Sequence, residues 1–234
     1  MTYSILARCP DTGRFGMSIA TYSVAVGQWC DGLHRRAGVT MSQAFVRTTN
    51  NDLALNLLKL GHSAKYVVDA LVRDDDFASY RQIGVISLDG TVDCHTGPNT
   101  RGSAGHQIGK GYVAMGNVLT DDRVVHTMAD AFESSVAQPF EERLLRALEA
   151  GRDAGGQGNG TRALAERSSG LIVTASDNLD AINLRVDLHP RAVDELRRLH
   201  SICSQYAGYY RSRGISPPDA PGQEVFETQN GIVC

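Results

Sequence analysis

Apolar and polar positions alternate in short runs through the first fifty residues, which is the pattern of β-strands. Residues 2–9 and 15–26 form two such runs, and residues 10–13 between them have the composition of a turn. Residues 39–46 form a third run, entered from Gly38. The pattern therefore predicts an opening β-hairpin followed by a third strand.

Two segments with helical spacing come next. Leu53, Leu57 and Leu60 lie on one stripe, and Gly61 is placed to end that helix. Ser63 is placed to cap a second helix. The apolar face predicted for this second helix contains Val67, Val68 and Leu71.

Strands and helices then recur in blocks. Residues 83–88 and 91–96 flank Asp89-Gly90, a pair that favours the tight primed turn of a β-hairpin. The remaining predicted elements are a strand at 111–119, a helix capped at Thr120, a helix at 141–150, a glycine-rich loop at 153–160, strands at 171–175 and 181–186, and a helix entered at Pro190.

The order of these elements indicates the fold class. Helices arrive in pairs and not one per strand, which argues against a parallel sheet of alternating β and α units. We predict an α+β fold in which two antiparallel sheets are covered on their outer faces by helix pairs. No linker interrupts the pattern over residues 1–213, which we predict to be one domain, with residues 214–234 as an irregular proline-containing tail.

Composition excludes several classes of function. The net charge of −3 and the isoelectric point near 6.1 give no basic surface for nucleic acid. No apolar run is long enough for a membrane span. Five cysteines without close-spaced pairs, together with the lack of a secretion signal, predict reduced thiols and a cytoplasmic protein.

Metal and nucleotide sites also find little support. The seven histidines are scattered, and neither His-Glu-x-x-His nor paired Cys-x-x-Cys occurs. The glycine-rich residues 155–160 lack the Lys-Ser/Thr that completes a phosphate loop, and no strand precedes them. We therefore predict no metal and no cofactor.

Thr2 carries the most distinctive chemistry if Met1 is removed, as a small second residue usually permits. Its hydroxyl would then lie beside its own α-amine, which makes a nucleophile and a base within one residue. An α-amine has a reference pKa of about 7.7–8.0, so a neutral fraction exists near physiological pH. Many unrelated chains begin Met-Thr, and in the chain as written Thr2 is not terminal. With Met1 retained, the Thr2 nitrogen is an amide without a basic lone pair, and we expect no such activity.

Other polar residues lie along or at the ends of predicted strands. Ser4 shares a strand face with Thr2 and is a second candidate nucleophile. A backbone N–H near Gln43 could serve an oxyanion hole, and the Asn117 side-chain amide could donate to the same oxyanion. An ordinary sheet hydroxyl, a sheet edge and a turn are the structural alternatives for these three positions.

His95 and Ser42 complete the candidate pocket, although a single histidine on a strand is more often a hydrogen-bonded structural residue. We predict that one cleft holds a catalytic set of Thr2, Gln43 and Asn117 and a substrate-pocket set of Ser4, Ser42 and His95.

Taken together, several short segments resemble the family called domain of unknown function 1028, in order over roughly residues 2 to 200. They are Thr2-Tyr3-Ser4-Ile5, Ala7-Arg8, Ala25-Val26-Gly27, Ser42-Gln43-Ala44-Phe45, His95-Thr96-Gly97 and Gly116-Asn117-Val118-Leu119. One segment departs from the family pattern: Gly155-Gly156-Gln157-Gly158 stands where the family tends to have Gly-Gly-Asp-Arg. The resemblance therefore assigns no pocket contacts there.

The resemblance implies a branch of the N-terminal nucleophile (Ntn) hydrolases, with their four-layer αββα sandwich. It implies an amide-bond hydrolase with Thr2 as nucleophile and the N–H near Gln43 as oxyanion donor. The partners we expect are a small-molecule amide substrate and a second copy of the chain in a homodimer. Two alternatives remain: a hydrolase that uses Ser4, or Cys94 near His95, and a non-catalytic protein that binds a small metabolite on a hydrolase fold.

Overall fold

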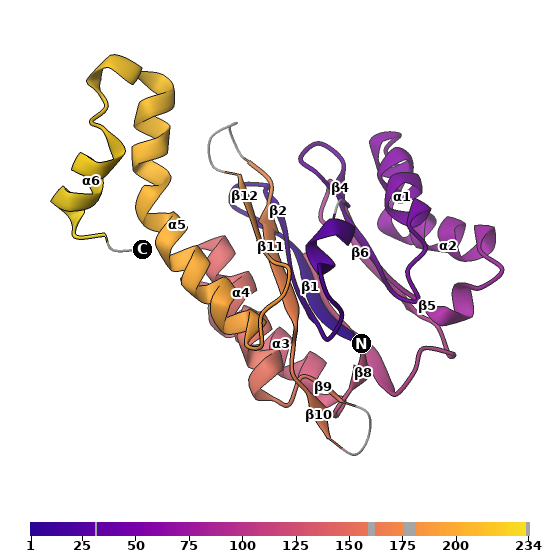
Figure 1. The fold of residues 1–234 in the computed structure, drawn as a ribbon. Helices are drawn as coiled ribbons and strands as arrows, with labels where there is room; N and C mark the ends of the chain where they lie inside the picture. Colours follow the sequence, from indigo (N-terminus) through magenta and orange to yellow (C-terminus); the bar gives the residue numbers. More distant parts are fainter. Residues whose placement is uncertain (31, 159–161, 176–180, 233–234) are drawn as a thin grey trace. The chain divides into compact units, whose positions relative to one another are not determined.

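The computed structural model describes residues 1–30, 32–158, 162–175 and 181–232 (Figure 1). The chain divides into two compact units, Met1–Leu196 and Arg197–Cys234, which we describe separately. The first unit contains both β-sheets. Within the described residues, no helix is long and apolar enough to cross a membrane.

The larger sheet is antiparallel and contains eight strands in the order β10-β9-β8-β1-β2-β11-β12, with β7 also paired to β8. The opening hairpin β1–β2 lies in its interior, because β1 pairs with β8 on its other side and β2 pairs with β11. The strands are β1 (Thr2–Arg8), β2 (Phe15–Thr21), β7 (Ser103–Gly109), β8 (Tyr112–Leu119), β9 (Gln157–Gly158), β10 (Ala163–Leu164), β11 (Ser168–Val173) and β12 (Ile182–Val186).

The smaller sheet has four antiparallel strands, β3 (Leu33–His34), β4 (Gly38–Ala44), β5 (Arg81–Ser87) and β6 (Val92–Thr96). The predicted β5–β6 hairpin is confirmed, but its turn differs. Gly90 N–H donates to the Ser87 carbonyl, Ser87 N–H donates to the Thr91 carbonyl, and Gly90 has a φ of 88°. These bonds make a three-residue loop ending in a left-handed glycine, and not the two-residue primed turn.

Each sheet has a helix pair against it (Figure 1). Helices α1 (Thr49–Lys59) and α2 (Ala64–Asp74) contact β4, β5 and β6, and helices α3 (Arg123–Ser134) and α4 (Phe140–Asp153) contact the larger sheet. The Ser63 side chain accepts the Tyr66 N–H, so the predicted cap of α2 is confirmed. The cap predicted at Thr120 is wrong, since α3 follows Asp122.

Two apolar clusters among the described residues pack the sheets against each other and against the first helix pair. One lies where the sheets face each other, since β1, β2 and β8 contact β4 and β5, and it includes Leu6, Met17, Met41, Ile86 and Met115. The other lies under the first helix pair and includes Leu55, Leu58, Val67, Leu71 and Ile83. The α+β class with two antiparallel sheets is confirmed.

Several elements differ from the predicted boundaries. Strand β7 was not expected, because its seven residues include Gly105 and Gly109 and lack a clear apolar alternation. The predicted loop at 153–160 begins with the last residue of α4 and contains β9. The rest of this loop, residues 159–160, lies outside the described residues, as do residues 176–180 before the last strand.

The end of the chain is more helical than predicted. Helix α5 covers Ala192–Ile215, and a 3-10 turn (Pro217–Asp219) and helix α6 (Gln223–Asn230) occupy residues expected to be irregular. Aromatic packing accounts for α6, because the Phe226 ring stacks on Tyr209 with centroids 4.2 Å apart. Two further 3-10 turns lie in the first unit: Val26–Trp29 between β2 and β3, and Ala78–Tyr80 between α2 and β5.

We predict that Gly16→Ala destabilises the protein by about 1–3 kcal/mol, because overpacking a buried contact forces neighbours to move. A Cβ at Gly16 would lie 2.5 Å from the Leu144 side chain and 2.9 Å from the Phe140 ring of α4. Gly170→Ala is the matched control, since its nearest neighbours would be 3.6 Å away. Urea denaturation measures both, and equal losses of stability would contradict the packing argument.

Candidate functional site

Thr2 is the first residue of β1 and lies in the middle of the larger sheet. The register places it directly between Thr21 of β2 and Asn117 of β8. Thr2 is 8% exposed, and its hydroxyl donates to Thr21 Oγ1 at 3.3 Å. The Thr21 hydroxyl in turn donates to the Met1 carbonyl. Thr2 is thus held by the strands on both sides of it, β2 and β8.

Strand alternation directs the Thr2 side chain between the two sheets. Ser4 and Leu6 share its face of β1, and Leu6 belongs to the apolar cluster between the sheets. The Ser4 hydroxyl donates across the gap to Gln43 Oε1 of β4 at 2.9 Å. The two sheets are therefore joined by polar groups at this end and by apolar side chains further along.

Gln82 of β5 lies at the centre of this polar end and is fully buried. Its Oε1 accepts from Gln43 Nε2 at 2.7 Å and from Asn117 Nδ2 at 3.1 Å. Its Nε2 lies within 3.0 Å of the Gly105 and Gly116 carbonyls and of Thr96 Oγ1. Gln82 therefore links both sheets and fixes the amides of Gln43 and Asn117.

Gln82 was not expected in the site, because it lies beside Arg81, just before the apolar run predicted as the strand at 83–88. Only the observed register shows that its side chain faces the space between the sheets, where a buried amide has to find hydrogen-bond partners. Thr21 was missed for a similar reason, because only the observed register shows that it pairs with Thr2.

Two predicted pocket residues point away from Thr2. The Ser42 hydroxyl accepts from Asn50 Nδ2 of α1 at 3.2 Å, and His95 Nε2 lies 2.9 Å from the Ala78 carbonyl. Strand alternation explains both placements, because Gln43 and Thr96 occupy the face between the sheets and their neighbours face the helices. The structure thus brings Thr2, Ser4, Gln43 and Asn117 together and leaves the side chains of Ser42 and His95 on the helix side.

The backbone N–H of Gln43 is directed into the smaller sheet. Thr40 N–H points away from β5, since it donates to the Gly32 carbonyl, and Gln43 therefore presents its N–H to Gln82 of β5. Ser42 and Ala44 direct their N–H groups to the other side of the strand. The Gln43 N–H faces its partner strand and not the space beside Thr2, which argues against its predicted role as an oxyanion donor.

Two unpartnered polar atoms lie at this end of the larger sheet. Asn117 Oδ1 and Gln157 Nε2 are both buried without a hydrogen-bond partner, in residues that are 1% and 0% exposed. Asn117 directs its Nδ2 toward Gln82, so its unpartnered atom is an acceptor and not the predicted donor. Gln157 was missed because its segment was interpreted as a loop.

Backbone strain occurs next to two of the site residues. Ala44 and Val118, which directly follow Gln43 and Asn117, have positive φ values of 72° and 52°. Left-handed backbone at a residue other than glycine costs free energy and is found frequently at functional sites. The strained residues therefore lie directly after the two side-chain amides of the site, those of Gln43 and Asn117.

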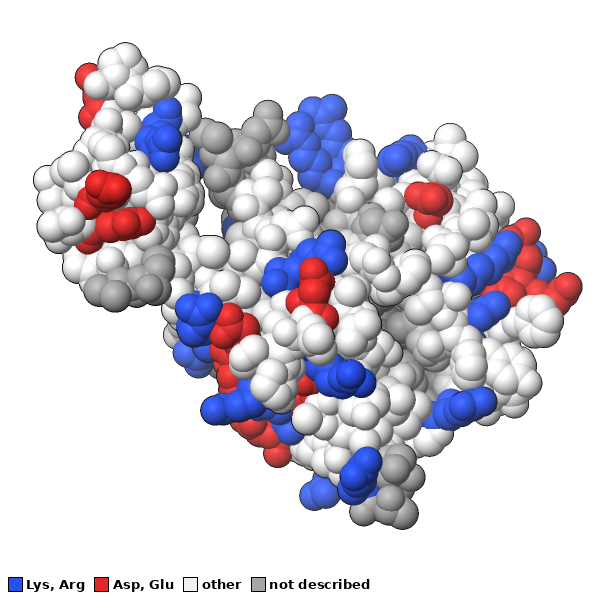
Figure 2. Space-filling model, viewed as in Figure 1, with Lys and Arg blue, Asp and Glu red and all other residues white. Residues whose placement is uncertain are grey.

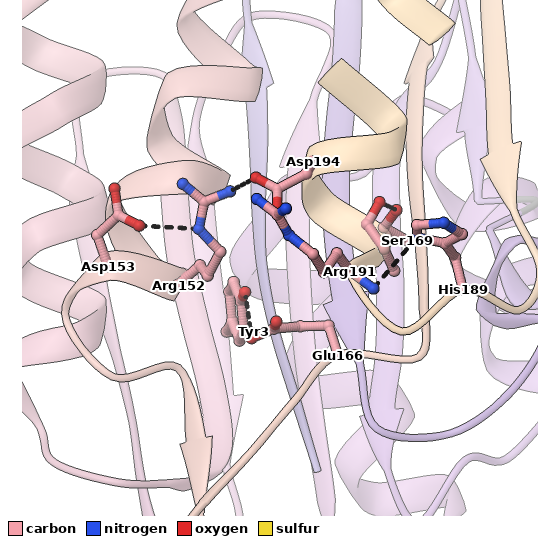
Figure 3. Close-up of polar contacts among 9 residues, drawn as sticks. Tyr3, Arg152, Asp153, Glu166, Ser169, His189, Arg191 and Asp194 are labelled. Carbon is pink, nitrogen blue, oxygen red and sulfur yellow. Dashed lines mark hydrogen bonds and ion pairs between the residues drawn. The ribbon is translucent and has the colours of Figure 1, made fainter. Parts of the chain in front are cut away.

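The helix side of β1 carries a second polar cluster (Figure 3). The Tyr3 hydroxyl donates to Glu166 Oε1 at 2.7 Å, and burial followed by the Glu166 charge raises the pKa of Tyr3 well above its ordinary value. Arg152 forms ion pairs with Asp153 and Asp194 at 2.8 and 2.6 Å. The residue after Thr2 is therefore anchored by its ring on the opposite face of the sheet.

Comparison with known proteins identifies the family. A family model described as a family of unknown function (DUF1028) matches residues 2–196, which is most of the chain. The chain belongs to the DUF1028 family. A search of proteins with curated descriptions finds no match.

A solved structure supports the DUF1028 assignment. The crystal structure of protein SPO2555 from Silicibacter pomeroyi, described as DUF1028, is 30% identical to this chain with a TM-score of 0.77. The match covers 86% of this chain and 88% of that chain. The family match begins at Thr2 and ends with the first compact unit of this DUF1028 protein.

We also searched the described residues for a metal site and for a surface patch of one charge. Among the described residues, no group of three or more His, Cys, Asp or Glu side chains could hold a metal ion. Basic and acidic side chains are interspersed on the face shown in Figure 2. The polar end between the sheets is instead built from hydroxyls and amides.

We predict that Gln82→Leu costs about 2–4 kcal/mol of folding free energy, because it leaves several buried amide and carbonyl groups without partners. A double-mutant cycle with Gln43→Leu should show a coupling of about 1–2 kcal/mol, as expected within one network. The control is Gln138→Leu, an exposed glutamine between α3 and α4. Chemical denaturation measures the folding free energy of each variant. If Gln82→Leu lost no more stability than Gln138→Leu, the Gln82 network would not be central to the fold.

Proposed function

We propose that this DUF1028 protein is an amide hydrolase whose nucleophile is Thr2, after Met1 has been removed. The observation that carries the proposal is the position of Thr2. It begins an interior strand, between Thr21 and Asn117, with its hydroxyl on the face that carries the buried Ser4, which bonds Gln43 of the facing sheet.

We propose further that the fold is the four-layer αββα sandwich of the Ntn hydrolases. Helix pairs contact each sheet, and the sheets contact each other through β1, β2, β4, β5 and β8. In such an arrangement the first residue of a central strand opens into the space between the sheets. The position of Thr2 at the start of such a strand therefore supports its role as an N-terminal nucleophile.

The reaction would proceed through an ester. The Thr2 hydroxyl oxygen attacks the amide carbonyl carbon while the Thr2 α-amine accepts the hydroxyl proton. The resulting oxyanion collapses, the C–N bond breaks, and the amine passes the proton to the leaving nitrogen. Water then attacks the ester with the amine again as base, which releases the acid and restores Thr2.

Asn117 is suited to orient this amine. The Arg8 N–H donates to the Gly111 carbonyl, so alternation along the β1–β8 ladder directs the Thr2 nitrogen to Asn117 as well. The unpartnered Asn117 Oδ1 could accept a second N–H from a free amine. We propose that Asn117 positions the base, in place of the oxyanion role expected from the sequence.

Met1 blocks this chemistry while it remains. The Thr2 nitrogen is then a peptide nitrogen with no basic lone pair, and the Met1 carbonyl is held by the Thr21 hydroxyl. Burial lowers the pKa of the Met1 amine below its ordinary value. That amine lies a full residue from the Thr2 hydroxyl, whereas a base has to lie within about 2.6–3.2 Å of its proton.

The internal nucleophiles are less well placed. Ser4 donates its hydroxyl to Gln43, an amide that cannot act as a base. Burial raises the pKa of the Cys94 thiol well above its ordinary value, and the thiol contacts Met115 at 3.9 Å. Since Cys94 and His95 are adjacent on a strand, their side chains face opposite sides of the sheet. A non-catalytic, metabolite-binding protein is the remaining alternative.

We predict that Met1-free protein hydrolyses small acyl anilides and that Met1-retained protein does not. Thr2→Ala should lower turnover at least about 1,000-fold, since removing a nucleophile costs most of the rate enhancement. Thr2→Ser, which keeps the hydroxyl and the amine, should retain part of the activity. Release of the aniline, followed by absorbance, measures all four proteins. Equal rates in all four would exclude Thr2, and no turnover in any of them would favour a binding protein.

A further inference from the structure

The Gln157 side chain accepts a hydrogen bond that the backbone of residue 1 would accept if β1 began one residue earlier. The β1–β2 register places Tyr22 opposite residue 1, because Thr21 lies opposite Thr2. Arg167 N–H donates to the Thr21 carbonyl, so Thr21 faces β11 and the next N–H, that of Tyr22, faces the β1 side. Gln157 Oε1 accepts this N–H at 3.0 Å.

The Gln157 backbone lies in the same gap. It pairs with Leu119 of β8, two residues beyond the Asn117 that faces Thr2. The side chain therefore spans from the β8 side to β2 just ahead of Thr2, in line with β1. A backbone N–H can only donate, so the Gln157 atom at Tyr22 has to be the oxygen. The nitrogen, Nε2, is then the atom without a partner.

The residue before Gln157 is closely packed and hydrogen-bonded. Gly156, with a φ of 56°, lies where a Cβ would meet Glu166 Oε1 at 2.7 Å and the Tyr3 ring at 3.3 Å. The Thr120 N–H donates to the Gly156 carbonyl at 3.1 Å. The Tyr3–Glu166 pair in Figure 3 thus fixes β9 against the residue that follows Thr2.

We propose that Gln157 Nε2 is an oxyanion donor of the Thr2 site. The proposal rests on the proposed function. As the Thr2 Oγ–carbon bond forms, the carbonyl π electrons move to oxygen, and a preorganised N–H aimed at that oxygen stabilises the charge. A buried N–H with no partner loses a hydrogen bond in the free protein and regains it when a carbonyl oxygen arrives.

The two unpartnered atoms around Thr2 also indicate the substrate class. Gln157 offers a donor, which suits a carbonyl oxygen, and the Asn117 oxygen has two lone pairs, so it can accept a substrate N–H as well as the Thr2 amine. Among the described residues, no charged side chain takes part in the hydrogen bonds that join Thr2, Ser4, Gln43, Gln82 and Asn117. A neutral amide supplies both a carbonyl oxygen and an N–H group.

The experiment measures acylation of Met1-free protein by a simple β-lactone. The lactone ring opens as Thr2 Oγ is acylated, the ring C–O bond breaks, and the released alkoxide takes the hydroxyl proton through the amine. Intact mass gives the acylation rate, and peptide mapping gives the residue. Gln157→Glu keeps an oxygen for the Tyr22 N–H and removes the donor, and we expect it to slow acylation at least about 100-fold.

Gln157→Met provides a second test without a buried charge, and Gln138→Glu is the matched control at an exposed site. Thermal melts identify any variant that does not fold. Slow acylation in folded Gln157→Glu or Gln157→Met, with wild-type rates in the control, would support the proposal. Equal acylation of Thr2 in all four proteins would overturn the role of Gln157 and leave Thr2 as nucleophile. Failure of wild-type Thr2 to react would instead overturn the proposed function.

Discussion

The hydrogen bonds of one buried glutamine hold the candidate site together. Gln82 lies on the smaller sheet, yet it bonds carbonyl groups of the larger sheet and the Asn117 amide. Buried amides are costly when unpaired, so the two sheets can meet at this end only in a register that satisfies Gln82. That register sets Gln43 opposite Ser4 and fixes the orientation of Asn117 beside Thr2.

A second set of contacts positions the start of the chain from the other face. Tyr3 is anchored to Glu166, and both side chains pack against Gly156, next to Gln157. Thr2 is therefore held by a network on each face of the sheet and by a neighbouring strand on each side. This arrangement leaves one acceptor and one donor unpaired at the position where the chain begins, which is the basis of the proposed chemistry.

Local patterns predicted most of the long strands and helices but not the contacts between them. Alternation in residues 2–9 and 15–26 was sufficient for the opening hairpin, and the paired helices indicated two antiparallel sheets. The same alternation, applied strictly, puts the side chains of Ser42 and His95 on the faces opposite to those of Gln43 and Thr96, and so separates the Ser42 and His95 side chains from Thr2. The roles of Gln82 and Thr21 depend on pairing between distant strands, which no local pattern specifies.

Composition alone did not identify the strand that carries Gln157. Glycines on both sides made its segment appear to be a loop, whereas the tertiary structure uses Gly156 to bring the backbone against Tyr3 and Glu166. A two-residue strand that fills a gap in a sheet has no periodicity that could identify it. Helix α6 escaped prediction for a related reason, since its order comes from Phe226 stacking on Tyr209 and not from its own sequence.

The proposed hydrolysis requires that Thr2 becomes the first residue of the chain. The most direct measurement is the mass of the protein isolated from the cells that make it, together with the mass of its N-terminal peptide. We predict a chain that is short by one methionine residue and an N-terminal peptide that begins at Thr2 with a free amine. A chain that retains Met1 in full, or a Thr2 amine that is acetylated, would contradict the proposal that Thr2 supplies both the nucleophile and the base.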